Sequence, residues 1–149
     1  MKPPAIIVDL DGTLCDTAHR QHHLEKKPKD WKSFFAGIPD DQPNEWCKRI
    51  VWAFEHKAQI IYVSGRDEDH RANTKQWLKS FHLEGIPKHP LFMRIAGDHR
   101  DDTIIKEELY RKYIEPNYQV MFCIDDRPKV ARMWRSIGLT CLQCNDKEF

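Results

Sequence analysis

Short apolar runs alternate with helically periodic segments along the whole chain. Three runs rich in β-branched residues, 5–8, 59–63 and 120–124, are typical of buried strands. Two weaker runs, 91–95 and 139–142, are further strand candidates. Because the three strong runs are continuous and do not alternate with polar residues, we expect strands that are buried on both faces of a parallel sheet.

Apolar residues at helical spacing fill the intervals between these strands. The spacing predicts four helices. The first two are marked by Trp46, Ile50, Val51 and Phe54, and by Ala72, Trp77, Leu78 and Phe81. The third is marked by Ile105, Leu109 and Tyr113 and is expected to start near Asp102 and end before Pro116, and the fourth is marked by Val130, Ala131, Trp134 and Ile137, between Pro128 and Gly138. This alternation predicts an α/β fold, a Rossmann-like three-layer sandwich with a mainly parallel central sheet.

The segment 15–42 follows neither period, and we expect it to form a small cap-like insert after the first strand of a single domain that spans 1–149. Its aromatic residues are interpreted as a mini-core that holds the insert in place, with stacking on a base as the alternative. Its histidines are interpreted as substrate contacts, since their spacing fits no metal site. These residues are Trp31, Phe34 and Phe35, and His19, His22 and His23.

The charge balance excludes one class of nucleic-acid-binding protein. The chain has 24 basic and 23 acidic side chains in 149 residues, a formal net charge of +1. Binding to nucleic acid by bulk charge alone is therefore not expected, but the balance does not exclude local binding of a single phosphate. No apolar run is long enough to cross a membrane, so no membrane partner is expected.

Cysteine usage and the start of the sequence indicate the compartment. The count of five cysteines is odd, and Met-Lys-Pro-Pro leads directly into a strand without a secretion signal. We therefore expect a cytoplasmic protein with reduced thiols. The Cys141–Cys144 pair is interpreted as the final strand and its turn, since a zinc site needs four ligands.

Acidic and phosphate-binding residues follow the three strongest strands. Asp9 and Asp11 follow the first, Ser64 and Gly65 follow the second, and the pair 125–126 follows the third. The carboxyl ends of neighbouring parallel strands meet at one crevice, so we expect these groups to lie together. Ionised carboxylates at close range repel one another, and a bound cation removes that repulsion. Oxygen ligands together with a phosphate suit Mg²⁺.

The motif from Asp9 to Thr13, followed in order by Ser64, Lys106 and the pair 125–126, resembles the haloacid dehalogenase superfamily of phosphotransferases. Segments 63–66, 97–106, 124–127 and 133–138 look like the 3′-phosphatase domain of phage-type polynucleotide kinase-phosphatases. This resemblance covers roughly residues 4–149 and is weakest in the insert. No glycine is followed by lysine, so the phosphate-binding loop of a kinase is absent from the sequence.

The resemblance implies a catalytic role for each of these residues. Asp9 would be the nucleophile and Asp11 the general acid and base. Asp9, the main-chain carbonyl of Asp11 and Asp125 would hold Mg²⁺. Phosphate oxygens would be bound by Ser64 and by the main-chain N–H of Gly65, and neutralised by Lys106. Asp126 would orient a metal-bound water or Lys106.

Supporting roles follow for the neighbouring residues. Asp102 lies one helical turn before Lys106 and is expected to orient it. Thr13 is expected to fix Asp11, and Arg66 and Arg127 to grip the substrate. Lys129, Arg132 and Arg135 either line the approach to the crevice or form an ordinary solvated helix face.

Three functions are compatible with these residues. The first is a Mg²⁺-dependent phosphatase that acts on 3′-phosphate ends of DNA or RNA, and the second is the same chemistry on free nucleotides or other small phosphomonoesters. The third is a catalytically silent binding module, which need not keep both carboxylates of the first turn. The short insert leaves the crevice open to a polymer end and favours the first function. No obligate protein partner is expected.

Overall fold

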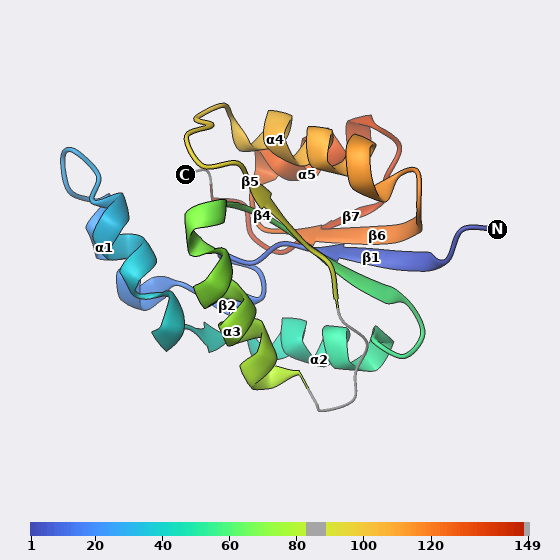
Figure 1. Ribbon diagram of the computed structural model, residues 1–149, viewed down its shortest axis with the longest axis horizontal. Helices are drawn as coiled ribbons and strands as arrows, with labels where there is room; N and C mark the ends of the chain where they lie inside the picture. Colours follow the sequence, from blue (N-terminus) through green and yellow to red (C-terminus); the bar gives the residue numbers. More distant parts are fainter. Residues whose placement is uncertain (83–88, 148–149) are drawn as a thin grey trace.

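The protein, in a computed structural model that describes residues 1–82 and 89–147, is built on a parallel sheet between two helical layers (Figure 1). The last two residues of the predicted domain lie outside the described part. The sheet has five strands in the order β5-β4-β1-β6-β7, and all neighbours run parallel. The strands are β1 (Pro4–Val8), β4 (Gln59–Asp67), β5 (Leu91–Arg94), β6 (Gln119–Asp125) and β7 (Cys141–Gln143). The predicted α/β fold is confirmed.

Two helices cover each face of the sheet (Figure 1). On one face lie α2 (Glu45–Phe54) and α3 (Arg71–Phe81). On the other lie α4 (Asp102–Leu109), which continues as a π-helical turn, η4 (Tyr110–Ile114), and α5 (Pro128–Ser136). A short 3-10 helix, η3 (Glu68–His70), leads into α3.

Successive residues of β1 supply the two halves of the core, because side chains alternate across a strand. Ile6 and Val8 belong to the cluster that includes Val51 of α2. Ala5 and Ile7 belong to the opposite cluster, which is completed by residues of α5 such as Trp134. Burial of β1 on both faces explains its uninterrupted apolar sequence.

The predicted elements are all present, but two strand boundaries differ from the prediction by more than one residue. β4 runs four residues beyond the predicted end, because backbone pairing with β5 continues as far as Asp67 and Arg94 although the residues there are polar. β7 begins at Cys141 and not at residue 139, since Gly138 (φ +92°) still belongs to the turn after α5.

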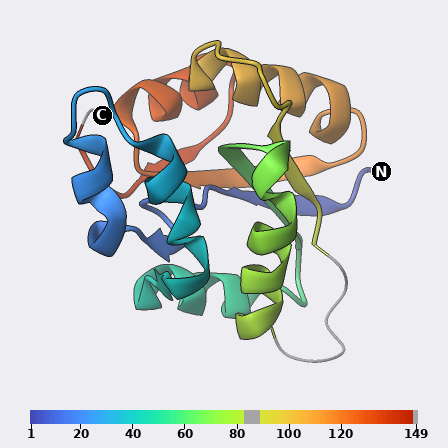
Figure 2. The same cartoon turned by 60° about the vertical axis from the view of Figure 1, so that its left-hand side comes forward.

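The predicted insert, 15–42, is made of short elements beyond the carboxyl ends of the strands (Figures 1 and 2). The elements are β2 (Cys15–Asp16), η1 (Ala18–Leu24), α1 (Trp31–Ala36), η2 (Ile38–Asp40) and β3 (Gln42–Pro43), and β2 pairs with β3 in antiparallel fashion. Trp31, Phe34 and Phe35 contact one another, and Phe34 is buried. The burial of Phe34 supports the mini-core interpretation, whereas Trp31 is 49% exposed, so stacking on a base stays an alternative for Trp31.

Within the described residues, no helix is both long enough and apolar enough to cross a membrane. The five cysteines are all free thiols, and Cys141 lies buried in β7. The interpretation of the Cys141–Cys144 segment as the final strand and its turn is confirmed.

Candidate active site

The predicted acidic residues meet at the carboxyl ends of three adjacent strands. Asp9 directly follows β1, and Asp125 is the last residue of β6, the neighbour of β1. Ser64 lies near the end of β4, on the other side of β1. The sheet order thus brings together groups that are more than a hundred positions apart in the sequence.

Three carboxylates, those of Asp9, Asp125 and Asp126, form the centre of the site. Their ligand oxygens lie within 4.8 Å of one another, and the three residues are 6%, 1% and 2% exposed. The hydroxyl of Thr13 bridges two of them, donating toward Asp9 Oδ2 at 3.1 Å or Asp126 Oδ1 at 3.2 Å. The expectation that Thr13 fixes Asp11 is wrong, because its hydroxyl is directed at this cluster.

Among the described residues, Lys106 is the only lysine or arginine that forms an ion pair with this cluster. Its Nζ lies 2.9 Å from Asp9 Oδ1 and 2.9 Å from Asp125 Oδ2, and the side chain is 2% exposed. Burial opposes the charged form of Lys106, but the charges of Asp125, Asp9 and Asp102 outweigh it and raise the lysine pKa. Lys106 is therefore a permanent positive charge beside the carboxylates.

The carboxylate cluster has an uncompensated negative charge. Three carboxylates face one ammonium group, which leaves two negative charges when all four are ionised. Burial and, to a smaller extent, the charge of Asp126 raise the pKa of Asp9 to about 7, against the opposing effect of Lys106. Burial and the charge of Asp9 likewise raise the pKa of Asp125 to about 6. A cluster of buried oxygen donors with excess negative charge fits a hard divalent cation.

Asp11 points away from this cluster and into a separate ion-pair network. Its carboxylate accepts hydrogen bonds from Arg20 Nη2 at 2.7 Å and from Arg66 Nε at 3.1 and 3.2 Å. Burial favours the protonated acid, but the two guanidinium groups outweigh it and hold the pKa of Asp11 well below its usual range. The predicted metal contact of Asp11 concerns its main-chain carbonyl and stays a prediction.

Asp41, at the end of the insert, anchors both arginines. Its side chain is fully buried and accepts bonds from Arg20 Nε at 2.8 Å, Arg20 Nη2 at 2.7 Å and Arg66 Nη2 at 3.4 Å. The insert is thus tied to the first turn of the site by two shared guanidinium groups.

Arg66, which was expected to grip the substrate, is a buried partner of Asp11. Its side chain is 1% exposed and also donates to Thr74 Oγ1 at 3.0 Å. A guanidinium that is so enclosed positions Asp11 and does not reach a ligand at the surface. Its predicted substrate contact therefore requires a rearrangement of this network.

Asp102 differs from its expected role in its partners. Its carboxylate accepts hydrogen bonds from Arg94 and Arg127, while Lys106 is held by Asp9 and Asp125. The charge of Asp102 still favours the ammonium form of Lys106. Arg127 is therefore fixed beside the site by Asp102, with its side chain 20% exposed.

Two glycines allow the turns of the site to approach acidic side chains. Gly12 has φ +83°, and a Cβ there would collide with Asp126. A Cβ on Gly65 would lie 2.8 Å from Asp102 Oδ1. The Ser64 side chain beside it is 1% exposed, and its Oγ accepts a bond from the main-chain N–H of Arg66.

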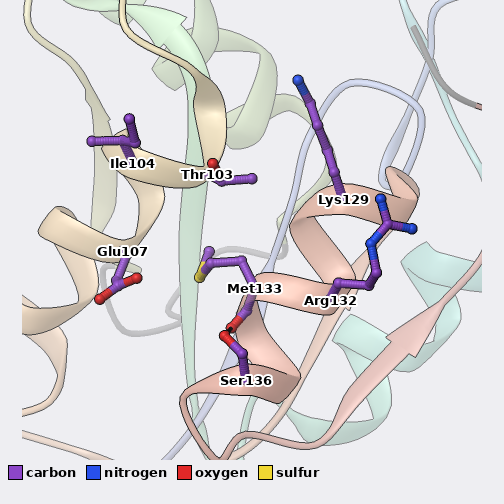
Figure 3. Close-up of a pocket in the computed structure, with 7 residues that line it drawn as sticks. All are labelled: Thr103, Ile104, Glu107, Lys129, Arg132, Met133 and Ser136. Carbon is purple, nitrogen blue, oxygen red and sulfur yellow. Dashed lines mark hydrogen bonds between the residues drawn. The ribbon is translucent and has the colours of Figure 1, made fainter.

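A shallow pocket of about 340 Å³ lies between α4 and α5 and contains none of these residues (Figure 3). It is lined by Thr103, Ile104, Glu107, Lys129, Arg132, Met133 and Ser136. Lys129 pairs with Asp101 at 2.6 Å, and Arg135 donates to the Cys141 carbonyl at 2.9 Å. These local contacts favour the solvated-face interpretation for Lys129 and Arg135.

The histidines of the insert form no ligand group among the described residues. His19 Nε2 lies 2.7 Å from Asp41 Oδ1, and the rings of His22 and His23 pack against each other at 3.9 Å.

Sequence reasoning missed Asp41, Thr74 and Arg94. Only Arg94 carried a usable signal, because it lies near the end of the predicted strand 91–95, as other site residues lie at or just after strand ends.

Comparisons with known proteins match the chain over nearly its whole length. Residues 3–149 fit the family model described as the phosphatase domain of polynucleotide kinase PNKP. A curated relative, the putative bifunctional polynucleotide kinase/RNA ligase of Autographa californica nuclear polyhedrosis virus, is 30% identical over 140 residues. That match covers 92% of this chain but 18% of the relative.

Solved structures show the same fold. A chain of the Pnkp1/Rnl/Hen1 RNA repair complex is 31% identical, with a TM-score of 0.84 over 99% of this chain and 44% of that chain. The class C acid phosphatase from Bacillus anthracis with tungstate bound has a TM-score of 0.73 at 15% identity, over 100% of this chain and 69% of that chain. The chain thus spans less than half the length of the first relatives it matches, and the acid phosphatase shows the fold alone.

Proposed function

Because this chain belongs to the family of polynucleotide kinase PNKP phosphatase domains and is a phosphatase, we propose that it removes 3′-phosphate groups from nucleic-acid ends with the help of Mg²⁺. The observation that carries this proposal is the buried group of Asp9, Asp125 and Asp126 around Lys106, at the ends of adjacent strands. One relative is described as a polynucleotide kinase/RNA ligase, and another comes from an RNA repair complex; both favour RNA over DNA as the substrate of this chain.

Asp9 is the nucleophile in this proposal. A carboxylate oxygen of Asp9 bonds to phosphorus while the bond between phosphorus and the 3′-oxygen breaks, which gives an aspartyl-phosphate and a free 3′-hydroxyl. Lys106, 2.9 Å from Asp9, neutralises the incoming phosphate and favours the ionised form of Asp9, which burial opposes. Thr13 holds the second carboxylate oxygen in place.

Asp11 moves the proton in both steps. It gives a proton to the departing 3′-oxygen and then takes one from the water that attacks the aspartyl-phosphate and regenerates Asp9. Arg20 and Arg66 hold Asp11 as a carboxylate, the form needed for the second step. Arrival of an anionic phosphate beside Asp11 favours its protonated form, which is the form needed for the first step.

The carboxylates of Asp9 and Asp125 and the main-chain carbonyl of Asp11 would hold Mg²⁺, with Asp126 beside them. When bound, the ion shields the negative charges of nucleophile and phosphate from each other. Ser64 and the main-chain N–H of Gly65 would bind phosphate oxygens on the β4 side, and Arg127, fixed by Asp102, would contact the substrate.

The direct test compares substrates that differ only in the phosphate position. Phosphate release is measured with Mg²⁺ from a 3′-phosphorylated RNA, its DNA counterpart, the 5′-phosphorylated RNA and a 3′-mononucleotide. We expect the highest kcat/KM on a 3′-phosphorylated oligonucleotide. Equal or higher kcat/KM on the mononucleotide would instead support the second function, a phosphatase of free nucleotides. No release from any of them would leave the binding module.

The expectation of no obligate protein partner stays a prediction. Two similar chains come from structures of complexes with Rnl and Hen1. Running the substrate comparison with this chain alone tests the expectation as well, because an isolated chain with full activity needs no partner.

A further inference from the structure

A second group of possible metal ligands lies at the amino-terminal ends of the strands, whereas the carboxylate cluster lies at their carboxyl ends. Glu55 directly follows α2, His82 directly follows α3, and His89 precedes β5. These positions adjoin the amino ends of β4 and β5, whereas Asp9 and Asp125 lie at carboxyl ends (Figure 1). The two groups are therefore separate sites.

The three side chains are spaced as ligands of one ion. Glu55 Oε2 lies 3.3 Å from His82 Nδ1 and 3.9 Å from His89 Nε2, and the ligand atoms all lie within 4.8 Å of one another. Metal–ligand bonds of about 2.0–2.1 Å in a tetrahedral site place ligand atoms roughly 3.3–3.4 Å apart. The distances from Glu55 Oε2 to the two imidazole nitrogens are close to that value, and small side-chain movements would bring all three ligand atoms to it.

Among the described residues, the buried carboxylate of Glu55 has no lysine or arginine as an ion-pair partner. Its side chain is 1% exposed, and its ion pairs within the described residues are with the two imidazoles alone. Buried carboxylates are rarely left unpaired in proteins.

His89 provides an independent sign of a missing ligand. Its side chain is 5% exposed, and its Nε2 has no hydrogen-bond partner among the described residues. The opposite nitrogen, Nδ1, lies 3.2 Å from Gln59 Nε2, and the ring also bonds to the Ile60 backbone, so the ring is fixed from that side. Metal binding would select the tautomer that carries its proton on Nδ1, because Nε2 then presents its lone pair to an ion beside the Glu55 carboxylate.

His82 is oriented in the same way. Its Nε2 lies 2.8 Å from the hydroxyl of Tyr62, so Nδ1 faces Glu55. Metal-binding histidines typically use their second nitrogen for such a hydrogen bond, which selects the tautomer and the ring direction. Both imidazoles thus have the outer contacts expected of ligands.

We propose that Glu55, His82 and His89 bind a zinc-type transition-metal ion, with a fourth position for water. Imidazole nitrogen suits Zn²⁺ and its neighbours in the transition series, whereas Mg²⁺ prefers oxygen ligands. The ion would link the ends of α2 and α3 to the start of β5, and it would be structural because it lies at the edge of the sheet remote from Asp9.

The test measures zinc bound to the full chain after removal of metal with a chelator. Excess Mg²⁺ is present throughout to saturate the carboxylate cluster, and a Cys144→Ser background removes the exposed thiol. We expect one tightly bound equivalent of Zn²⁺, and Co²⁺ in its place should give the strong visible absorption of four-coordinate cobalt. Absence of zinc binding, or the weak spectrum of six-coordinate cobalt, would overturn the proposal without any ligand variant.

Paired variants identify the ligands. His89→Gln should weaken zinc binding by more than the roughly 10–100-fold loss typical of an outer hydrogen-bond partner. The matched change His22→Gln, at an exposed histidine of the insert, should leave it unchanged. Glu55→Gln preserves the shape of the site and replaces the first variant if that one does not fold. Wild-type affinity in folded His89→Gln or Glu55→Gln would contradict the assignment, and Mg²⁺-dependent phosphatase activity should survive in both.

Discussion

At the scale of single residues, the two aspartates of the first turn differ in their surroundings. Burial, together with the charge of Asp126, raises the pKa of Asp9 to about 7 against the opposing effect of Lys106, whereas Arg66 and Arg20 hold the pKa of Asp11 well below its usual range. Carboxylates in such different surroundings are suited to different tasks. Asp9 can lie next to a metal ion and a phosphate, and Asp11 can exchange protons with the leaving group.

The proton-transfer role of Asp11 predicts a dependence on the leaving group. Asp11→Asn should lower kcat about 10²–10⁴-fold on a 3′-phosphorylated oligonucleotide, whose alkoxide needs a proton. The loss should be much smaller on an aryl phosphate, whose phenolate leaves without one. The ratio of the two losses is the measurement, because any general disturbance of the site cancels in it. Equal losses on both substrates would contradict the assignment.

The buried Asp41 carboxylate predicts a coupled loss of stability and activity. Asp41→Asn leaves the guanidinium groups of Arg20 and Arg66 short of one negative partner, and removal of one member of a buried pair typically costs about 3–5 kcal/mol. We expect a lower free energy of unfolding in urea and a lower kcat through displacement of Asp11.

The adjacent variant Asp40→Asn is the control, since this residue is exposed. It should change the free energy of unfolding by less than about 0.5 kcal/mol. Similar effects of the two variants would show that the Arg20–Asp41–Arg66 network does not hold Asp11.

Site residues that follow a local sequence pattern could be predicted, whereas those placed by contacts between distant segments could not. Asp9, Ser64 and Asp125 were found because each directly follows or ends a β-branched run, a local pattern. Asp41 is brought to Arg66 by packing of the insert, which no periodicity records. Arg66 was expected to grip the substrate because it directly follows a site motif, but ion pairs with Asp11 and the buried Asp41 enclose its guanidinium group.

At the scale of elements, α4 carries Lys106 from one helical layer to the end of the sheet. The helix begins at Asp102, and the preceding Asp101 side chain accepts a hydrogen bond from Thr103 N at 2.9 Å as its N-cap. Asp101 also pairs with Lys129 of α5, so one carboxylate joins the starts of two helices. The placement of Lys106 therefore depends on the first turn of α4.

This cap predicts a measurable contribution to stability. Asp101→Ala should lower the free energy of unfolding by about 0.5–2 kcal/mol, because the first turn of α4 loses its acceptor. Urea denaturation monitored by circular dichroism measures the change. Lys112→Ala, after the end of α4, is the comparison and should have a smaller effect. An Asp101→Ala protein as stable as the wild type would show that neither the cap nor the ion pair with Lys129 contributes to stability.

At the scale of the whole molecule, folding assembles the carboxylate cluster at an energetic cost. The burial that raises the pKa of Asp9 and Asp125 opposes their ionisation, and the single ammonium of Lys106 compensates only part of their charge. A divalent ion that binds the folded state alone therefore shifts the folding equilibrium. Stability of the entire chain becomes a readout of the site.

Mg²⁺ should raise the melting temperature. The free energy of unfolding should increase by about 2.7 kcal/mol when the Mg²⁺ concentration is a hundredfold above its dissociation constant. Chelation should remove both this gain and the turnover. Asp125→Asn should abolish the shift, whereas Asp146→Asn, at an exposed position, should retain it. An equal Mg²⁺ shift in both variants would place the ion elsewhere.

The most direct test of the account is detection of phosphate on Asp9 during turnover. The enzyme is mixed with Mg²⁺ and a 3′-phosphorylated oligonucleotide, quenched in acid within the first turnover, digested and analysed by mass spectrometry. The account predicts one phosphoryl group on the peptide that contains Asp9, and neither this group nor phosphate release in the Asp9→Asn variant. Phosphate release at the full rate with Asp9 unmodified, or by Asp9→Asn, would contradict it.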